Sequence, residues 1–228
     1  MSSVILPATI EKINGKRIHI QQSNKYTIPN NVTKLRNYCF LNCTNITKIE
    51  LNEGLLDIGK YCFWSCINLK EIKIPNTVKK LGKECFNSCT NLARIELNEG
   101  LLKISEYSFS YCKTLKEIII PNTVTKLGIW CFSNCSNVTK IELNEGIIKI
   151  GEYCFYCCQS LKKIIIPNTV TKLGNYCFSQ GYNLTKIELN EGLLEIGDKC
   201  FDYGYSLKEI IIPNTVTKIG KEIGRAHV

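Results

Sequence analysis

The sequence predicts an α/β solenoid, in which short equal units stack along one axis and share a single core. Three observations support this fold class. A pattern of apolar residues, Gly, Cys and Phe recurs every 23 residues from Ile28 to Ile211, and units of this length cannot bury their apolar faces alone. Each unit carries the L-x-x-I-x-I pattern of a short strand. All eight phenylalanines hold one position of the unit: Phe40, Phe63, Phe86, Phe109, Phe132, Phe155, Phe178 and Phe201.

The repeat divides the chain into three parts. Residues 28–220 hold eight full units and the start of a ninth, with units that begin IPN alternating with units that begin LNEG. Residues 1–27 are predicted to form an N-terminal cap, either a degenerate unit or a hairpin, because Asn14-Gly15 lies between apolar arms. Residues 221–228 break the repeat and end in IGRAHV, which resembles a translated sequencing adapter. We therefore expect a non-native tail there.

Residues 163–167, KIIIP, show how each unit forms its strand. Ile164 and Ile166 alternate toward the core, while Lys163 and Ile165 point outward. Pro167 has no N–H to donate to a ladder and ends the strand. We expect one such strand per unit, and therefore one parallel sheet.

After the strand, the chain returns through the core and then reverses. Val170 and Leu173 are predicted to be buried, and Gly174 ends this segment with a turn. We interpret the following residues 175–181, NYCFSQG, as a short helical turn on the convex side. The phenylalanines would then stack inside the coil at the strand spacing of ~4.8 Å.

These positions together resemble a known family. The consensus L-x-x-I-x-I-P-x-x-V-x-x-(I/L)-G-x-x-C-F-x-x-C is similar to the 23-residue leucine-rich repeat of BspA-like proteins, with Cys where that family often has Ala before Phe. The resemblance covers Ile28 to Gly220. It implies a curved, right-handed solenoid with a parallel sheet on its concave face. Such proteins are often surface or secreted adhesins and recognition modules rather than enzymes, which implies a protein or glycan ligand.

Fourteen cysteines are the most obvious chemical feature of the chain. Seven precede a Phe and six follow one by three positions, which leaves Cys157. A zinc site is disfavoured because the pairs line up along the axis instead of converging as C-x-x-C ligand sets. Structural disulfides stay open as an alternative. The register favours buried thiols that pack as small apolar residues, which fits a reducing compartment.

Catalysis has little support in the sequence. Histidine occurs only at His19 and His227, both outside the units. The chain has no P-loop, no H-E-x-x-H motif and no paired-carboxylate constellation. We therefore expect a protein that is not an enzyme and needs no cofactor.

The sequence offers few indications of location or assembly. No apolar run reaches the ~18 residues that would suggest a membrane span. Residues 1–9 lack the basic start and apolar core of a signal peptide. The sequence alone therefore predicts a cytoplasmic location, while the family resemblance suggests a cell-surface or secreted location. We expect a monomer when the ends of the stack are capped.

Much of the net charge of +9 gathers at one position of the unit. This position would form a basic ridge, interrupted by Asp57 and Glu195, that could bind a phosphate polymer or an anionic surface. A solvated edge that keeps the stack soluble is the favoured interpretation, because Glu is interleaved throughout. No aromatic-basic module indicates nucleic acid. The lysines of the ridge are Lys34, Lys80, Lys103, Lys126, Lys149, Lys172 and Lys218.

The outward side chains of the strands define the predicted binding face. Charges on adjacent strands mostly alternate in sign and can pair across the sheet. Three isoleucines two strands apart, each flanked by Glu, break this pattern. They are either tolerated for β-propensity or form the apolar centre of a ligand surface rimmed by charge. The candidate ligand-binding residues are Ile119, Ile165, Ile211, Glu96, Glu142, Glu188, Lys140, Lys163 and Lys186.

Two function hypotheses follow. The first is a recognition or adhesion module that binds a protein or glycan on its concave face. The second is an intracellular scaffold or structural repeat protein with a buried thiol core.

Overall fold

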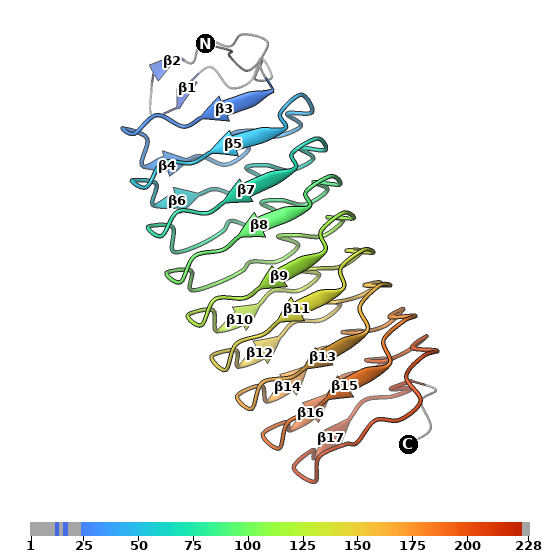
Figure 1. Ribbon diagram of the computed structural model, residues 1–228. Coiled ribbons are helices and arrows are strands. Elements are labelled where there is room, and N and C mark those ends of the chain that lie inside the picture. Colours follow the sequence, from blue (N-terminus) through green and yellow to red (C-terminus); the bar gives the residue numbers. More distant parts are fainter. Residues whose placement is uncertain (1–11, 14–15, 18–23, 225–228) are drawn as a thin grey trace.

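The computed structural model describes residues 12–13, 16–17 and 24–224 of the chain. Each 23-residue unit forms one turn of a β-solenoid, because residues in neighbouring turns pair in parallel at an offset of 23, as Lys25 does with Lys48. The turns follow one another along a single axis from the N-terminal to the C-terminal end (Figure 1). Every strand therefore faces its own repeat in the next turn, which confirms the stacking that the period predicts.

The first row of strands, which we call the long-strand face, holds three residues per strand. In each strand from β5 to β15 the central residue is buried and its two neighbours are exposed or half-buried, as the alternation of the sequence predicts. Ladder bonds join β3-β5-β7-β8, then β9 with β11, and then β13 with β15. The strands are β3 (Lys25–Thr27), β5 (Lys48–Glu50), β7 (Glu71–Lys73), β8 (Arg94–Glu96), β9 (Glu117–Ile119), β11 (Lys140–Glu142), β13 (Lys163–Ile165) and β15 (Lys186–Glu188).

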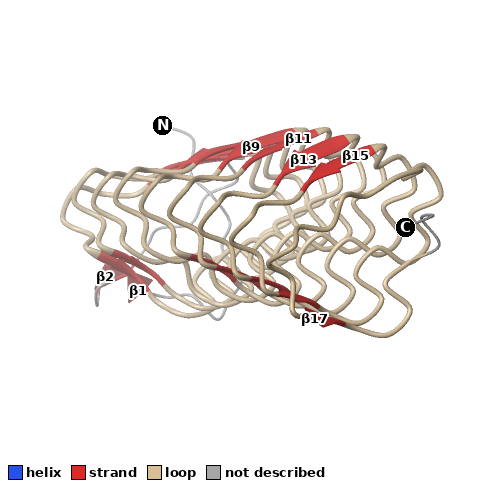
Figure 2. Cartoon of the chain, turned by 90° about the horizontal axis from the view of Figure 1, so that it is seen from below, coloured by secondary structure: helices blue, strands red, loops and turns tan. Residues whose placement is uncertain are grey.

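A second row of strands, the short-strand face, lies on the other side of the coil (Figure 2). The expected strand is present in each unit from β5 to β15, but the expectation of a single sheet was wrong, since the segment that returns through the core also pairs between turns. Isolated bridges continue the row where no strand is assigned, as between Lys80 and Lys103. The strands are β4 (Lys34–Leu35), β6 (Asp57–Ile58), β10 (Lys126–Leu127), β12 (Lys149–Ile150), β14 (Lys172–Leu173), β16 (Glu195–Ile196) and β17 (Lys218–Ile219).

The N-terminal segment contains one further pair of strands. β1 (Lys12–Ile13) pairs antiparallel with β2 (Lys16–Arg17), so the two strands flank the Asn14-Gly15 dipeptide. The dipeptide itself, most of the predicted cap over residues 1–27 and residues 225–228 of the predicted tail lie outside the described residues. The division into cap, solenoid and tail stays a prediction.

The short helical turns predicted on the convex side are not formed, so the α/β assignment is wrong: residues 24–224 contain no helix. In each turn two residues, such as Tyr153 (φ 54°) and Cys157 (φ 59°), adopt the left-handed conformation, which interrupts a right-handed helix. The N–H groups of Tyr153, Phe155 and Cys157 donate to carbonyls of the next turn at 2.8, 2.8 and 2.9 Å. These donors are thus unavailable for helical bonds. No helix in the described part of the chain could span a bilayer.

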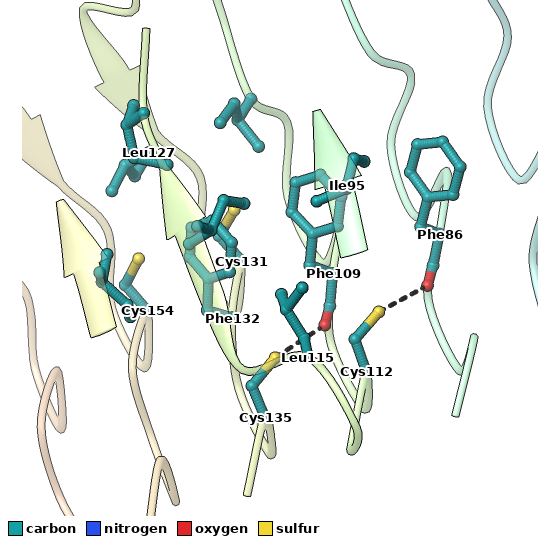
Figure 3. Close-up of a cluster of buried hydrophobic side chains, with 14 of the residues drawn as sticks. Phe86, Ile95, Phe109, Cys112, Leu115, Leu127, Cys131, Phe132, Cys135 and Cys154 are labelled. Atoms are coloured by element: carbon teal, nitrogen blue, oxygen red, sulfur yellow. Dashed lines mark hydrogen bonds between the residues drawn. The ribbon is translucent and has the colours of Figure 1, made fainter. Parts of the chain in front are cut away.

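The phenylalanines form the predicted column at the centre of the core. Successive rings stack at centroid distances from 5.1 to 5.9 Å, and all eight are buried. Figure 3 shows Phe86, Phe109 and Phe132 in this column, with aliphatic and cysteine side chains packed beside them. The two strand faces therefore rest on the same aromatic column.

Candidate functional site

The cysteines form two columns inside the coil. Six cysteines follow a Phe by three positions, and five of their thiols donate to a phenylalanine carbonyl of the preceding turn, as Figure 3 shows for Cys112 and Cys135. Cys112 Sγ lies 3.3 Å from the carbonyl oxygen of Phe86, and Cys135 Sγ lies 3.1 Å from that of Phe109. These thiols satisfy backbone acceptors and fill space between turns, which is a structural role.

The environment of the cysteines disfavours thiol chemistry. All fourteen are free, and only Cys157 is more than marginally exposed. Burial raises the pKa of the Cys89 thiol to about 12 and raises the pKa of Cys112 and Cys135 as well. A protonated, buried thiol is a poor nucleophile. Within residues 24–224 and the short described strands before them, no group of three or more His, Cys, Asp or Glu is arranged to hold a metal ion.

The long-strand face carries the predicted isoleucines in exposed positions. Ile119 and Ile165 end β9 and β13 and are 64% and 54% exposed. Ile211 is 77% exposed, but it lies beyond β15 in a segment that forms no strand. Singly exposed aliphatic residues are common on protein surfaces, and Leu102 and Ile148 are exposed to a similar degree, 55% each. The structure thus places two of the three isoleucines on strands of the row.

The charged residues predicted to rim this face pair with one another. Glu188 accepts from Lys163 at 2.8 Å and from Lys186 at 2.9 Å, and these hydrogen bonds lower the pKa of its carboxyl to about 2. Lys140 pairs with Glu142 on β11. Glu96 pairs in the same way with Arg94, at 2.7 Å on β8. The charges of the predicted rim are therefore balanced by ion pairs on the face itself.

Two grooves cross the long-strand face. The larger, about 650 Å³, lies between β8 and β9 and brings Glu96 and Ile119 together with Pro121. The smaller, about 270 Å³, is lined by charged residues of β5, β7 and β8 and by Pro75. No aromatic side chain lines either groove. An apolar floor with charged walls suits a polypeptide segment better than a sugar ring, which usually stacks on an aromatic face.

Sequence analysis missed a second aromatic row, on the surface of the coil. Tyr107, Trp130, Tyr153 and Tyr176 stack at centroid distances of 6.0, 4.0 and 4.6 Å. The signal was present, because these residues share the position two before Phe. Each ring covers the face of the next, and Lys83 lies 5.6 Å over the ring of Tyr107 at one end. Because the rings stack face to face, the row offers few open faces to a sugar.

Solved structures share this fold. A leucine rich cell surface protein from Faecalibacterium prausnitzii matches with a TM-score of 0.74 and 22% identity, covering 96% of this chain and 71% of that one. A leucine-rich repeat protein from Bacteroides ovatus matches at 0.66 and 24%, covering 87% and 63%. The pneumococcal vaccine antigen PcpA matches at 0.59 and 20%, covering 97% and 62%. The chain thus spans less than two thirds of the last two proteins.

Sequence comparison identifies the family. No curated protein sequence matches the chain. The family model for the BspA type leucine rich repeat region matches residues 11–137 and 102–223, with six copies of the repeat. Together these matches span nearly the whole solenoid and confirm the resemblance that the consensus predicts. The chain therefore belongs to the BspA type leucine-rich repeat family.

Proposed function

We propose that this leucine-rich repeat protein is a non-enzymatic recognition module whose long-strand face binds a protein partner. The observation that carries the proposal is the pair of exposed isoleucines at the ends of β9 and β13, Ile119 and Ile165, which are 64% and 54% exposed. An apolar centre surrounded by charge is the usual anatomy of a protein interface. The charged residues around the isoleucines pair with one another, and the apolar side chains of Ile119 and Ile165 stay exposed to a partner.

A protein partner is favoured over a glycan. The grooves of the long-strand face are lined by aliphatic, proline and charged side chains and by no aromatic ring. The surface aromatic row offers few open ring faces. A role in adhesion is consistent with the description of the F. prausnitzii protein as a cell surface protein, and it forms part of this proposal.

A second candidate is an intracellular scaffold, and the fourteen free cysteines favour it. Free thiols in such number fit a reducing compartment. The two candidates share the same binding face and differ in the partner. An extracellular protein recovered on this face would support adhesion, and an intracellular one would support the scaffold.

The test compares two double variants in binding to a partner captured by the unsubstituted chain. Ile119→Thr with Ile165→Thr removes the apolar centre and keeps the β-branch that strands favour. We expect a loss of affinity of at least about tenfold, since apolar burial drives the contact. The matched control is Leu102→Thr with Ile148→Thr, because both of these aliphatic residues are 55% exposed and precede the short-strand face.

Unchanged binding by the Ile119 and Ile165 variant, or equal losses in both variants, would contradict the proposal. Circular dichroism melting of both variants establishes that each is folded. Binding of the unsubstituted chain to an array of neutral glycans, lost on the same double substitution, would replace the protein partner by a glycan.

A further inference from the structure

We propose that the short-strand face carries a second binding site, for a linear anionic polysaccharide, built from four lysines in consecutive turns. We call these residues the central lysine row: Lys80, Lys103, Lys126 and Lys149. This site is separate from the long-strand face and does not depend on the function proposed for that face.

The register places the four lysines directly side by side. Lys80 pairs with Lys103 in a parallel bridge, and Lys126 pairs with Lys149 between β10 and β12. The bridge between Ile104 and Leu127 continues the same register across the middle of the row. Neighbouring strands are ~4.8 Å apart. Like charges directly opposite one another on adjacent strands destabilise a sheet, so stability does not explain this arrangement.

At both ends of the same ridge the lysines have acidic partners. Lys34 lies 2.6 Å from Asp57 at one end. At the other, Glu195 lies 2.6 Å from Lys172 and 3.8 Å from Lys218. In the part of the chain that the structure describes, no lysine of the central row forms an ion pair, and all four are exposed. The ion pairs between lysines of the ridge and acidic residues are thus found at its ends.

A small groove lies beside three lysines of the central lysine row. It has a volume of about 130 Å³, and its lining includes Lys103, Lys126 and Lys149. Gly128 and Gly151 line the same groove. A Cβ at Gly151 would lie 2.7 Å from the carbonyl carbon of Gly128, so close stacking of the turns requires glycine there. The lysines of successive turns therefore lie beside a strip of glycine backbone, across which an extended polymer can lie.

The other residues of the groove indicate which polyanion fits. Glu152 and Glu106 also line it, and a carboxylate can only accept hydrogen bonds. A polysaccharide has hydroxyl donors between its anionic groups, whereas inorganic polyphosphate has none and would be repelled by both carboxylates. Nucleic acid strands are held by stacking on aromatic side chains, and no aromatic residue lines this groove. Charge and hydrogen bonding together favour a sulfated or carboxylated sugar chain, whose anionic groups can bind the lysines without the aromatic stacking that a neutral sugar ring uses.

The test measures binding of dextran sulfate, with neutral dextran of the same length as the reference, at several salt concentrations. The triple variant Lys103→Gln, Lys126→Gln, Lys149→Gln should lose at least about tenfold in affinity and should show a shallower salt dependence, because fewer counterions are released. The matched control is Lys70→Gln, Lys113→Gln, Lys162→Gln. It removes the same charge from three exposed lysines outside the ridge and should lose less than about twofold.

Thermal melting shows whether a loss of affinity comes from unfolding of the variant. The triple variant of the central row should melt at or above the temperature of the unsubstituted chain, because it removes repulsion between neighbours. Equal losses of affinity in both triple variants would overturn the proposal, since binding would then follow net charge alone. Absence of dextran sulfate binding at physiological ionic strength would also overturn it. Tighter binding of inorganic polyphosphate or of a single-stranded oligonucleotide, at equal charge, would reject the polysaccharide as the ligand.

Discussion

The two strand faces are built on one core with one repeat, yet they treat charge in opposite ways. On the long-strand face opposite charges meet, as where Glu188 binds Lys163 and Lys186. On the short-strand face four lysines follow one another in register without an acidic partner in residues 24–224. The ion pairs of the long-strand face stabilise that face. On the short-strand face the charges of the central lysine row have no ion-pair partner in residues 24–224 and can bind an anionic ligand. The comparison thus distinguishes charges that stabilise the fold from charges that are available to a ligand.

The largest expected effect comes from the core that both faces share. Phe132→Ala should lower the free energy of unfolding by roughly 3 to 5 kcal/mol, because a fully buried ring leaves a cavity between stacked turns. Hydrogen exchange should increase on both β9–β11 and β10–β12. The control is Ile119→Ala on the exposed surface, which should change stability by less than about 0.5 kcal/mol. A cost below about 1 kcal/mol for Phe132→Ala, or faster exchange on one face only, would show that the faces do not depend on a common column.

An intermediate effect should differ in sign between the two faces. Lys126→Glu places a carboxylate between two lysines of the ridge and should stabilise the fold by roughly 0.2 to 1 kcal/mol. Glu195 already holds such a position between Lys172 and Lys218. Lys163→Gln removes a partner of Glu188 on the long-strand face and should destabilise by less than about 0.5 kcal/mol, since that pair is exposed and screened. Urea denaturation of both variants measures the difference, and the same sign for both would remove the contrast between the faces.

The smallest expected effect is a local titration. Hydrogen bonds from Lys163 and Lys186 lower the pKa of the Glu188 carboxyl from its ordinary value of 4.5 to about 2. Because the folded pKa is the lower one, the contribution of Glu188 to stability is present above pH 4.5 and is lost as the pH falls toward about 2. Lys186→Gln should raise this pKa toward 4.5, as followed by NMR of the carboxyl carbon. A pKa that stays near its value in the unsubstituted chain would mean that Lys163 alone holds the carboxylate.

Much of the fold could be predicted because the same residue pattern recurs in every unit, so that each inference rests on several copies. The period of 23 residues fixed the offset between paired strands, and Ile164 and Ile166 were correctly assigned to the core. The exposure of Ile119 and Ile165 was also predicted correctly. Their role in binding stays a prediction. The ridge was visible as a shared lysine position, but its division into paired ends and an unpaired centre was not.

By itself, the sequence determined the stacking, the aromatic column and the family, because these follow from the spacing of apolar residues along one chain. Only the tertiary structure decided what the backbone does on the convex side. There the N–H groups of Tyr153 and Phe155 bond to the next turn of the solenoid, so the segment forms a run of tight turns instead of a helix. The structure also decided which charges meet, since several ion pairs join side chains from different turns. A local pattern cannot report these results, because the hydrogen bonds between turns and ion pairs such as Lys172 with Glu195 join residues about one full repeat apart in the chain.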